Sequence, residues 1–330
     1  MTRTRSRHGF DPVLPWIRVA LLATATLAAI PVAVAQDAAT WLARAATAAQ
    51  QQNYVGTIVY QHGGYVETSR LIHLNELGNE FEKLVNLEGP AREVIRSHGE
   101  VRCYYPDAKV IRIEPRTFRN AFPSLSPQQQ TALADYYHFR QAERGRVAGI
   151  ETQAWVFEPK DGLRYGHKFW ADPASGLLVK ARIVDARNEV VEQFAFTEIA
   201  IGVKIDREMV KPTWAVAPPD WQVRQLGPGE SEAKETGWTV SRIPPGFLKI
   251  VEGFRRLDGA REVAHLVYSD GLVAVSVFIE PIGGAPHPIG ISRQGGINVF
   301  IRQQDDNLVT VLGEVPAATV RQIAQSVARR

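Results

Sequence analysis

The hydrophobic period of the chain changes from helical to strand-like after Asn53, and this change constrains the fold more than any other feature. Over residues 37–50, apolar residues recur every three or four positions, which predicts one amphipathic helix. After Asn53, short β-branched and aromatic runs alternate with tight turns, beginning with residues 55–60 and the turn His62-Gly63-Gly64-Tyr65. Tight turns join antiparallel neighbours, whereas parallel strands need long crossovers. The sequence therefore predicts an antiparallel sheet and excludes a parallel α/β fold.

The same alternation continues as far as Phe196. A second helix is expected to start at Ser126-Pro127 and to run toward Tyr136, because serine caps helices and proline suits their first turn. A large sheet with few helices has two faces to bury. One solution is a curved half-barrel around an apolar cavity that receives a lipid or a peptide; an ordinary filled core is the alternative. The strands expected here are residues 68–74, 80–87, 92–96, 101–105, 109–113, 153–157, 163–170, 177–184 and 189–196.

The composition shifts to proline, glycine and glutamate over residues 212–237, which is typical of a linker. Trp214 and Trp221 within it are expected to dock on a domain. A smaller α+β unit follows at residues 238–330, with a helix from Pro316 to the C-terminus. Its expected strands are residues 238–243, 262–268, 272–279, 297–302 and 308–312. The sequence thus predicts a large domain at 36–211, a linker at 212–237 and a small domain at 238–330.

Residues 1–35 are typical of a cleavable signal peptide. A basic leader is followed by an uncharged run at residues 19–30 and by Ala33-Val34-Ala35, the small-residue pattern of a cleavage site. The chain has 38 basic and 35 acidic residues, but the leader holds four of the former and one of the latter, so the remainder is neutral. A neutral chain argues against nucleic-acid binding. We expect a soluble, exported protein that begins at Gln36.

Catalytic and metal-binding motifs are missing from the sequence. It contains no nucleophile elbow, zinc-protease, dithiol, phosphate-loop or dinucleotide pattern, and its histidines lack metal spacing. Ser269, Asp270 and His265 are hydrolase residue types, but Asp270-Gly271 is better explained as a hairpin turn. The single cysteine, Cys103, is expected to be a buried thiol that forms no internal disulfide. The sequence therefore predicts neither an enzyme, a cofactor nor a metal.

Aromatic residues after the second helix are the candidates for a lipid site. Tyr136, Tyr137 and Phe139 would suit the rim of a cavity, and Trp170 is a fourth candidate for its lining. Packing of the second helix against the sheet is an equally good explanation of the first three.

Several segments resemble the MucB/RseB family in the same order along the chain. The likeness covers essentially the whole chain after the leader. In the large domain the resemblance rests on Asn53-Tyr54-Val55-Gly56-Thr57, Arg146-Val147-Ala148-Gly149, Tyr165-Gly166-His167-Lys168-Phe169-Trp170-Ala171-Asp172 and Ser175-Gly176-Leu177-Leu178-Val179-Lys180-Ala181. In the small domain it rests on Val267-Tyr268-Ser269-Asp270-Gly271-Leu272, Ser276-Val277-Phe278 and Val315-Pro316-Ala317-Ala318-Thr319-Val320.

The resemblance implies a periplasmic negative regulator of the sigma-E envelope-stress response. It also implies a lipoprotein-carrier-like large domain. Such a protein would bind the periplasmic part of a single-pass inner-membrane anti-sigma factor, shield it from proteolysis, and be released by a lipid or lipopolysaccharide fragment. The family places the anti-sigma contact within residues 238–330 and the groove between the domains. A periplasmic lipid or lipoprotein carrier is the alternative, although a simple carrier lacks the second domain. Homo-oligomerisation is left open.

Overall fold

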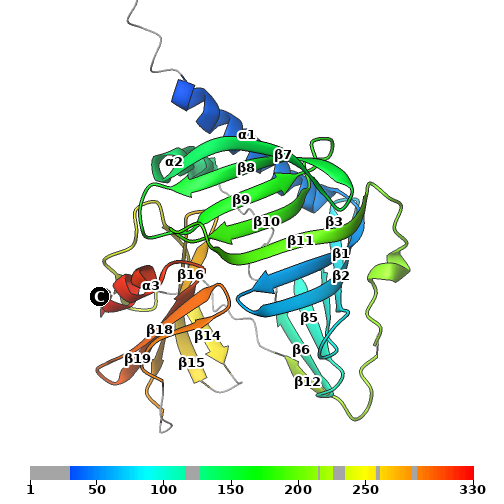
Figure 1. Ribbon diagram of the computed structural model, residues 1–330. Helices are drawn as coiled ribbons and strands as arrows, with labels where there is room; N and C mark the ends of the chain where they lie inside the picture. Colours follow the sequence, from blue (N-terminus) through cyan, green and yellow to red (C-terminus); the bar gives the residue numbers. More distant parts are fainter. Residues whose placement is uncertain (1–29, 116–126, 215, 226–234, 258–260, 284–287) are drawn as a thin grey trace, which may run out of the picture.

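Two sheets of different size organise the chain (Figure 1). The computed structural model describes residues 30–115, 127–214, 216–225, 235–257, 261–283 and 288–330. Within these residues, a twelve-stranded sheet has the order β12-β6-β5-β4-β3-β2-β1-β11-β10-β9-β8-β7, and a six-stranded sheet has the order β14-β15-β16-β19-β18-β17. We call the first, with helices α1 and α2, the large domain, and the second, with α3, the small domain.

One long-range pairing joins the two halves of the large sheet. Strand β1 pairs along its whole length with β11, so that the strands before and after α2 form one sheet. Its strands are β1 (Tyr54–His62), β2 (Tyr65–Glu76), β3 (Asn79–Asn86), β4 (Glu93–Ser97), β5 (Glu100–Tyr105), β6 (Val110–Pro115), β7 (Tyr137–Val147), β8 (Ile150–Pro159), β9 (Gly166–Ala171), β10 (Leu178–Val184), β11 (Val190–Ile201) and β12 (Gln222–Gln225).

Helix α1 (Ile30–Gln51) fills one face of this sheet because its alanines and leucine form a narrow apolar stripe. Ala38, Leu42 and Ala45 are buried against β8, β9 and β10. Ala48 continues the stripe onto β1 and β11, where it meets Tyr54. Helix α2 (Pro127–Tyr136) packs beside α1. The helix expected at residues 37–50 is therefore present within a longer one.

The segment after β11 folds back onto the other side of the sheet. Its short 3-10 helix η1 (Arg207–Val210) packs on β2 and β3. Trp214 and Trp221 then pack against each other, with 5.3 Å between ring centroids, and Trp214 stacks on Tyr104. The docking of both tryptophans is confirmed. The segment also contributes β12, which pairs in parallel with β6 and is an exception to the antiparallel pattern.

The small domain packs α3 (Ala317–Gln325) and a two-stranded ribbon against its sheet. Val320 and Ile323 of α3 are fully buried in this core with Val275, Val277 and Val311. The ribbon pairs β13 with β20. The strands are β13 (Trp238–Val240), β14 (Leu248–Leu257), β15 (Arg261–Ser269), β16 (Ala274–Pro281), β17 (Gly290–Gln294), β18 (Ile297–Gln304), β19 (Asn307–Gly313) and β20 (Val327–Arg329).

These elements confirm the expected fold class, which is mainly β with a large curved sheet and a smaller α+β domain. Some local predictions were wrong. The last helix ends at Gln325 and the chain continues as β20, because pairing with β13 buries Val327. The sequence analysis also missed β7, β14 and β17; β7 was missed because exposed charged residues interrupt its alternation. Most of the expected leader, residues 1–29, and the cap at Ser126 lie outside the described residues.

Candidate functional site

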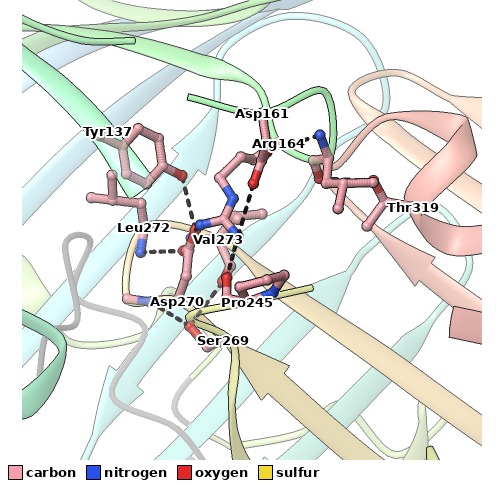
Figure 2. Close-up of polar contacts among 11 residues, drawn as sticks. Tyr137, Asp161, Arg164, Pro245, Ser269, Asp270, Leu272, Val273 and Thr319 are labelled. Carbon is pink, nitrogen blue, oxygen red and sulfur yellow. Dashed lines mark hydrogen bonds and ion pairs between the residues drawn. The ribbon is translucent and has the colours of Figure 1, made fainter. Parts of the chain in front are cut away.

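A buried polar contact joins the two domains and is the best-defined candidate site in the chain (Figure 2). Three segments that are distant in the sequence supply it. Arg164 comes from the loop between β8 and β9, Tyr137 from the junction of α2 and β7, and Asp270 from the turn between β15 and β16. The side chains of Arg164 and Asp270 are 0% and 1% exposed. We call this group the Arg164–Asp270 contact.

Asp270 uses both carboxylate oxygens. The hydroxyl of Tyr137 donates to Oδ2 at 2.9 Å, and the guanidinium Nη1 of Arg164 lies 3.6 Å from the same oxygen. Oδ1 accepts the backbone N–H groups of Leu272 and Val273, each at 3.0 Å, which closes the hairpin turn. Burial raises the pKa of Asp270, and the charge of Arg164 opposes that rise. The turn predicted at Asp270-Gly271 is confirmed. The same aspartate also binds Tyr137 and Arg164 of the large domain.

Arg164 is the large domain's half of this contact, and it also binds the small domain's backbone. Its Nη2 donates to the carbonyl of Pro245 and lies 3.5 Å from Asp161. The guanidinium lies over the rings of Tyr136 and Phe247, at 4.9 and 5.1 Å from their centroids. Removing one partner of a buried charge pair costs about 3–5 kcal/mol, because the other charge is left without compensation. Replacing either Arg164 or Asp270 alone should therefore weaken the association of the two domains strongly.

Uncharged contacts surround this pair. Thr319 donates its hydroxyl to the carbonyl of Leu163 at 2.7 Å, and the Asn298 amide donates to the Tyr165 hydroxyl at 3.0 Å. Leu272, although part of the small domain, is buried within the large domain's core cluster. Apolar burial, hydrogen bonds and an ion pair thus all stabilise the interface around the Arg164–Asp270 contact.

Three of the four predicted lipid-site residues meet beside this contact. Tyr136, Tyr137 and Phe139 all pack in the cluster that also contains Leu272. Tyr137 is 1% exposed, and Phe139 packs edge-on against Phe157 with 5.0 Å between ring centroids. The side chains therefore form a filled aromatic cluster next to the domain contact. Their role in binding a lipid stays a prediction.

Trp170 lies apart from the other three. Neighbouring residues on a strand point to opposite faces, and Phe169 faces α1, so Trp170 faces the other side of the sheet. It is 6% exposed because three cationic side chains cover its ring: Lys168, Lys180 and Arg182, at 4.9, 5.0 and 5.5 Å from its centroid. Burial, followed by the charges of Arg182 and Lys168, lowers the pKa of Lys180. The structure does not bring Trp170 together with Tyr136, Tyr137 and Phe139.

The sequence analysis missed Arg164, Asn298 and Thr319 as members of a site. Arg164 follows the turn at Pro159-Lys160-Asp161-Gly162 and looks like a solvent-exposed loop residue. The described residues contain no cluster of three or more histidine, cysteine or acidic side chains that could hold a metal ion. None of the described helices is long and apolar enough to cross a membrane.

Comparisons with known proteins match both domains. The MucB/RseB N-terminal domain matches residues 37–214, and the MucB/RseB C-terminal domain matches residues 232–328. The chain belongs to the MucB/RseB family. It is 32% identical to the sigma factor AlgU regulatory protein MucB of Pseudomonas aeruginosa, over 93% of this chain and 96% of that protein. It is 25% identical to the sigma-E factor regulatory protein RseB of Escherichia coli, over 85% of this chain and 87% of that protein.

Solved structures of MucB have the same fold. A crystal structure of MucB in complex with MucA(peri) has a TM-score of 0.68 and 31% identity, covering 89% of this chain and 99% of that one. A structure of MucB alone has a TM-score of 0.62 and 29% identity, over 89% and 98% of the two chains. The family is thus one of regulatory binding proteins. The relatives regulate sigma factors, and MucB forms a complex with MucA(peri).

Proposed function

We propose that this protein binds the periplasmic region of a membrane anti-sigma-E factor and shields it from regulated proteolysis. The observation that carries the proposal is the match to MucB along both domains, together with the complex of MucB and MucA(peri). A shield needs an extended, stable surface and no chemistry. The Arg164–Asp270 contact, whose two side chains are buried, joins the domains.

The proposal assigns a part to each segment. Residues 1–35 direct the chain to the periplasm and are removed, 36–211 sense a lipid, and 212–237 link this domain to the next. Residues 238–330, with the groove between the domains, hold the anti-sigma factor. A linker alone would let the two domains separate, so the contacts between them set the shape that the partner meets.

The place of Leu272 supports release by a lipid or lipopolysaccharide fragment. This side chain of the small domain is buried among the aromatic residues of the large domain, including Tyr137 and Phe139. An acyl chain that entered the aromatic cluster would compete with Leu272 for the same apolar space. Such a ligand binds better when the domains are apart, and this difference in affinity is what a ligand needs to shift a conformational equilibrium.

The test is binding between the mature protein and the periplasmic segment of its cognate anti-sigma factor. We expect binding at micromolar concentrations or tighter, and slower cleavage of that segment by the protease that makes the first cut. Leu272→Ala should make this cleavage faster than it is with the unaltered protein. Leu77→Ala, at a site 98% exposed, should leave the cleavage rate unchanged. A protein that binds lipid but not the segment would instead be a lipid or lipoprotein carrier.

A further inference from the structure

A second contact between the domains buries a carboxylate oxygen of the large domain against the small domain. The free end of the β1–β2 hairpin and the start of β11 approach the hairpin that joins β17 to β18 (Figure 1). A Cβ atom added to Gly295 would lie 2.4 Å from Nδ1 of His62, and one added to Gly296 would lie 2.4 Å from Oε2 of Glu192. The two hairpins approach this closely because both positions are glycine.

Glu314 reaches the same place from the small domain. Gly313 pairs with Asn298 at the end of the ladder of β19 and β18, so Glu314 follows the end of β19 next to the β17–β18 hairpin. Burial, followed by the negative charge of Glu192, raises the pKa of Glu314 to about 7. Burial also raises the pKa of Glu192. We call this group the Glu192–Glu314 contact.

On the contacting hairpin, the exposed Arg293 of β17 donates to the carbonyl of Gly295 at 2.8 Å. From β1, the Tyr60 hydroxyl hydrogen-bonds to Glu192 and His62 acts on it electrostatically, while Glu67 of β2 acts on Tyr60. Among the described residues, no lysine or arginine acts on either carboxyl. Glu192 Oε2 is buried and has no hydrogen-bond partner in the part of the chain that the structure describes. An ionised Glu192 would therefore keep negative charge on a buried oxygen that has no donor, which disfavours the ionised form.

We propose that the Glu192–Glu314 contact makes the association of the two domains depend on pH: protonation of the carboxyl pair closes the contact, and loss of that proton opens it. Two ionised carboxylates repel each other in a buried site, and protonation of one of them removes this repulsion. The Arg164–Asp270 contact then keeps the domains associated while the Glu192–Glu314 contact opens.

The direction follows from proton linkage. The acidic group of Glu314 has a higher pKa when the contact is closed than when it faces water, so closure takes up a proton. Closure is favoured most below the ordinary pKa of 4.5 and weakens as the pH rises toward about 7. Each unit by which closure raises this pKa changes the ratio of closed to open molecules about tenfold across that range.

The experiment uses the full mature chain without any partner, so its outcome does not depend on the proposed function. Selective ¹³C labelling of glutamate carboxyls gives the titration of Glu314 by NMR, assigned by the loss of its signal in Glu314→Gln. Hydrogen exchange at residues 58–64 and 290–300, with the radius of gyration from X-ray scattering, reports opening between pH 4.5 and 8.5. We expect Glu314 to titrate near 7, and exchange in both segments to rise with pH beyond the intrinsic chemical rate.

Glu314→Gln should keep both segments protected at pH 8, because a neutral amide carries no charge into the contact. Glu192→Gln should act in the same way and serves as a second variant if the first does not fold. Glu158→Gln, at an exposed glutamate on β8, is the matched control and should respond to pH as the unaltered chain does. A Glu314 that titrates near 4.5, or a Glu314→Gln protein with the same pH response as the unaltered chain, would overturn the proposal.

Discussion

The two contacts between the domains differ in the sign of the charges that they bury. At the Arg164–Asp270 contact, opposite charges meet with a tyrosine hydroxyl, and Oδ1 of Asp270 accepts two backbone donors as well. At the Glu192–Glu314 contact, two like charges meet with no lysine or arginine acting on them among the described residues. The first contact is held by attraction between opposite charges, whereas the second depends on a proton. The domains can therefore stay associated through the Arg164–Asp270 contact while the Glu192–Glu314 contact opens.

The largest effect is expected from Arg164→Met, which leaves Asp270 buried without its counter-charge. This variant should lower the free energy of association of the domains by about 3–5 kcal/mol, measured as lost protection from hydrogen exchange at residues 269–273. The double variant Arg164→Met with Asp270→Asn should lose less than the two single variants together, since no charge is then left buried. Arg187→Met, at a side chain 76% exposed, should change the protection little. Additive losses would mean that the ion pair does not join the domains.

Sequence patterns predicted the elements better than the contacts between them. The stripe of α1, the hairpin at His62 to Tyr65 and the docking of Trp214 and Trp221 depend on local periods and turn chemistry, and all three are present. The pairing of β1 with β11 and the bond between Tyr137 and Asp270, 133 residues apart, have no local signal. Asp270 shows most clearly what sequence patterns miss. Its Oδ1 forms the turn that the sequence predicts, whereas its Oδ2 forms the domain contact, which has no sequence pattern.

Glycines at the two contacts should respond differently to an added methyl group. Gly246 has φ +86°, and a Cβ there would lie 2.4 Å from the ring of Tyr136, which is packed beneath Arg164. Gly296 faces instead the end of the Glu192 side chain, which can rotate away. Gly246→Ala should therefore cost about 1–3 kcal/mol of stability, and Gly296→Ala less than about 1 kcal/mol, in denaturant unfolding. Equal costs would contradict the view that the first contact is rigid and the second adjustable.

The smallest effect concerns Thr319, whose hydroxyl donates to the carbonyl of Leu163 across the domain contact at 2.7 Å. Thr319→Val keeps the shape of the side chain but leaves that carbonyl without its donor, which should cost about 1–2 kcal/mol in denaturant unfolding. Thr197 makes a similar bond to the carbonyl of Thr57 at 3.2 Å, but it is exposed. Water replaces the lost donor there, so Thr197→Val should cost less than about 0.5 kcal/mol. If both substitutions cost the same, solvent reaches Leu163 too, and the Arg164–Asp270 contact is looser than the burial of its side chains indicates.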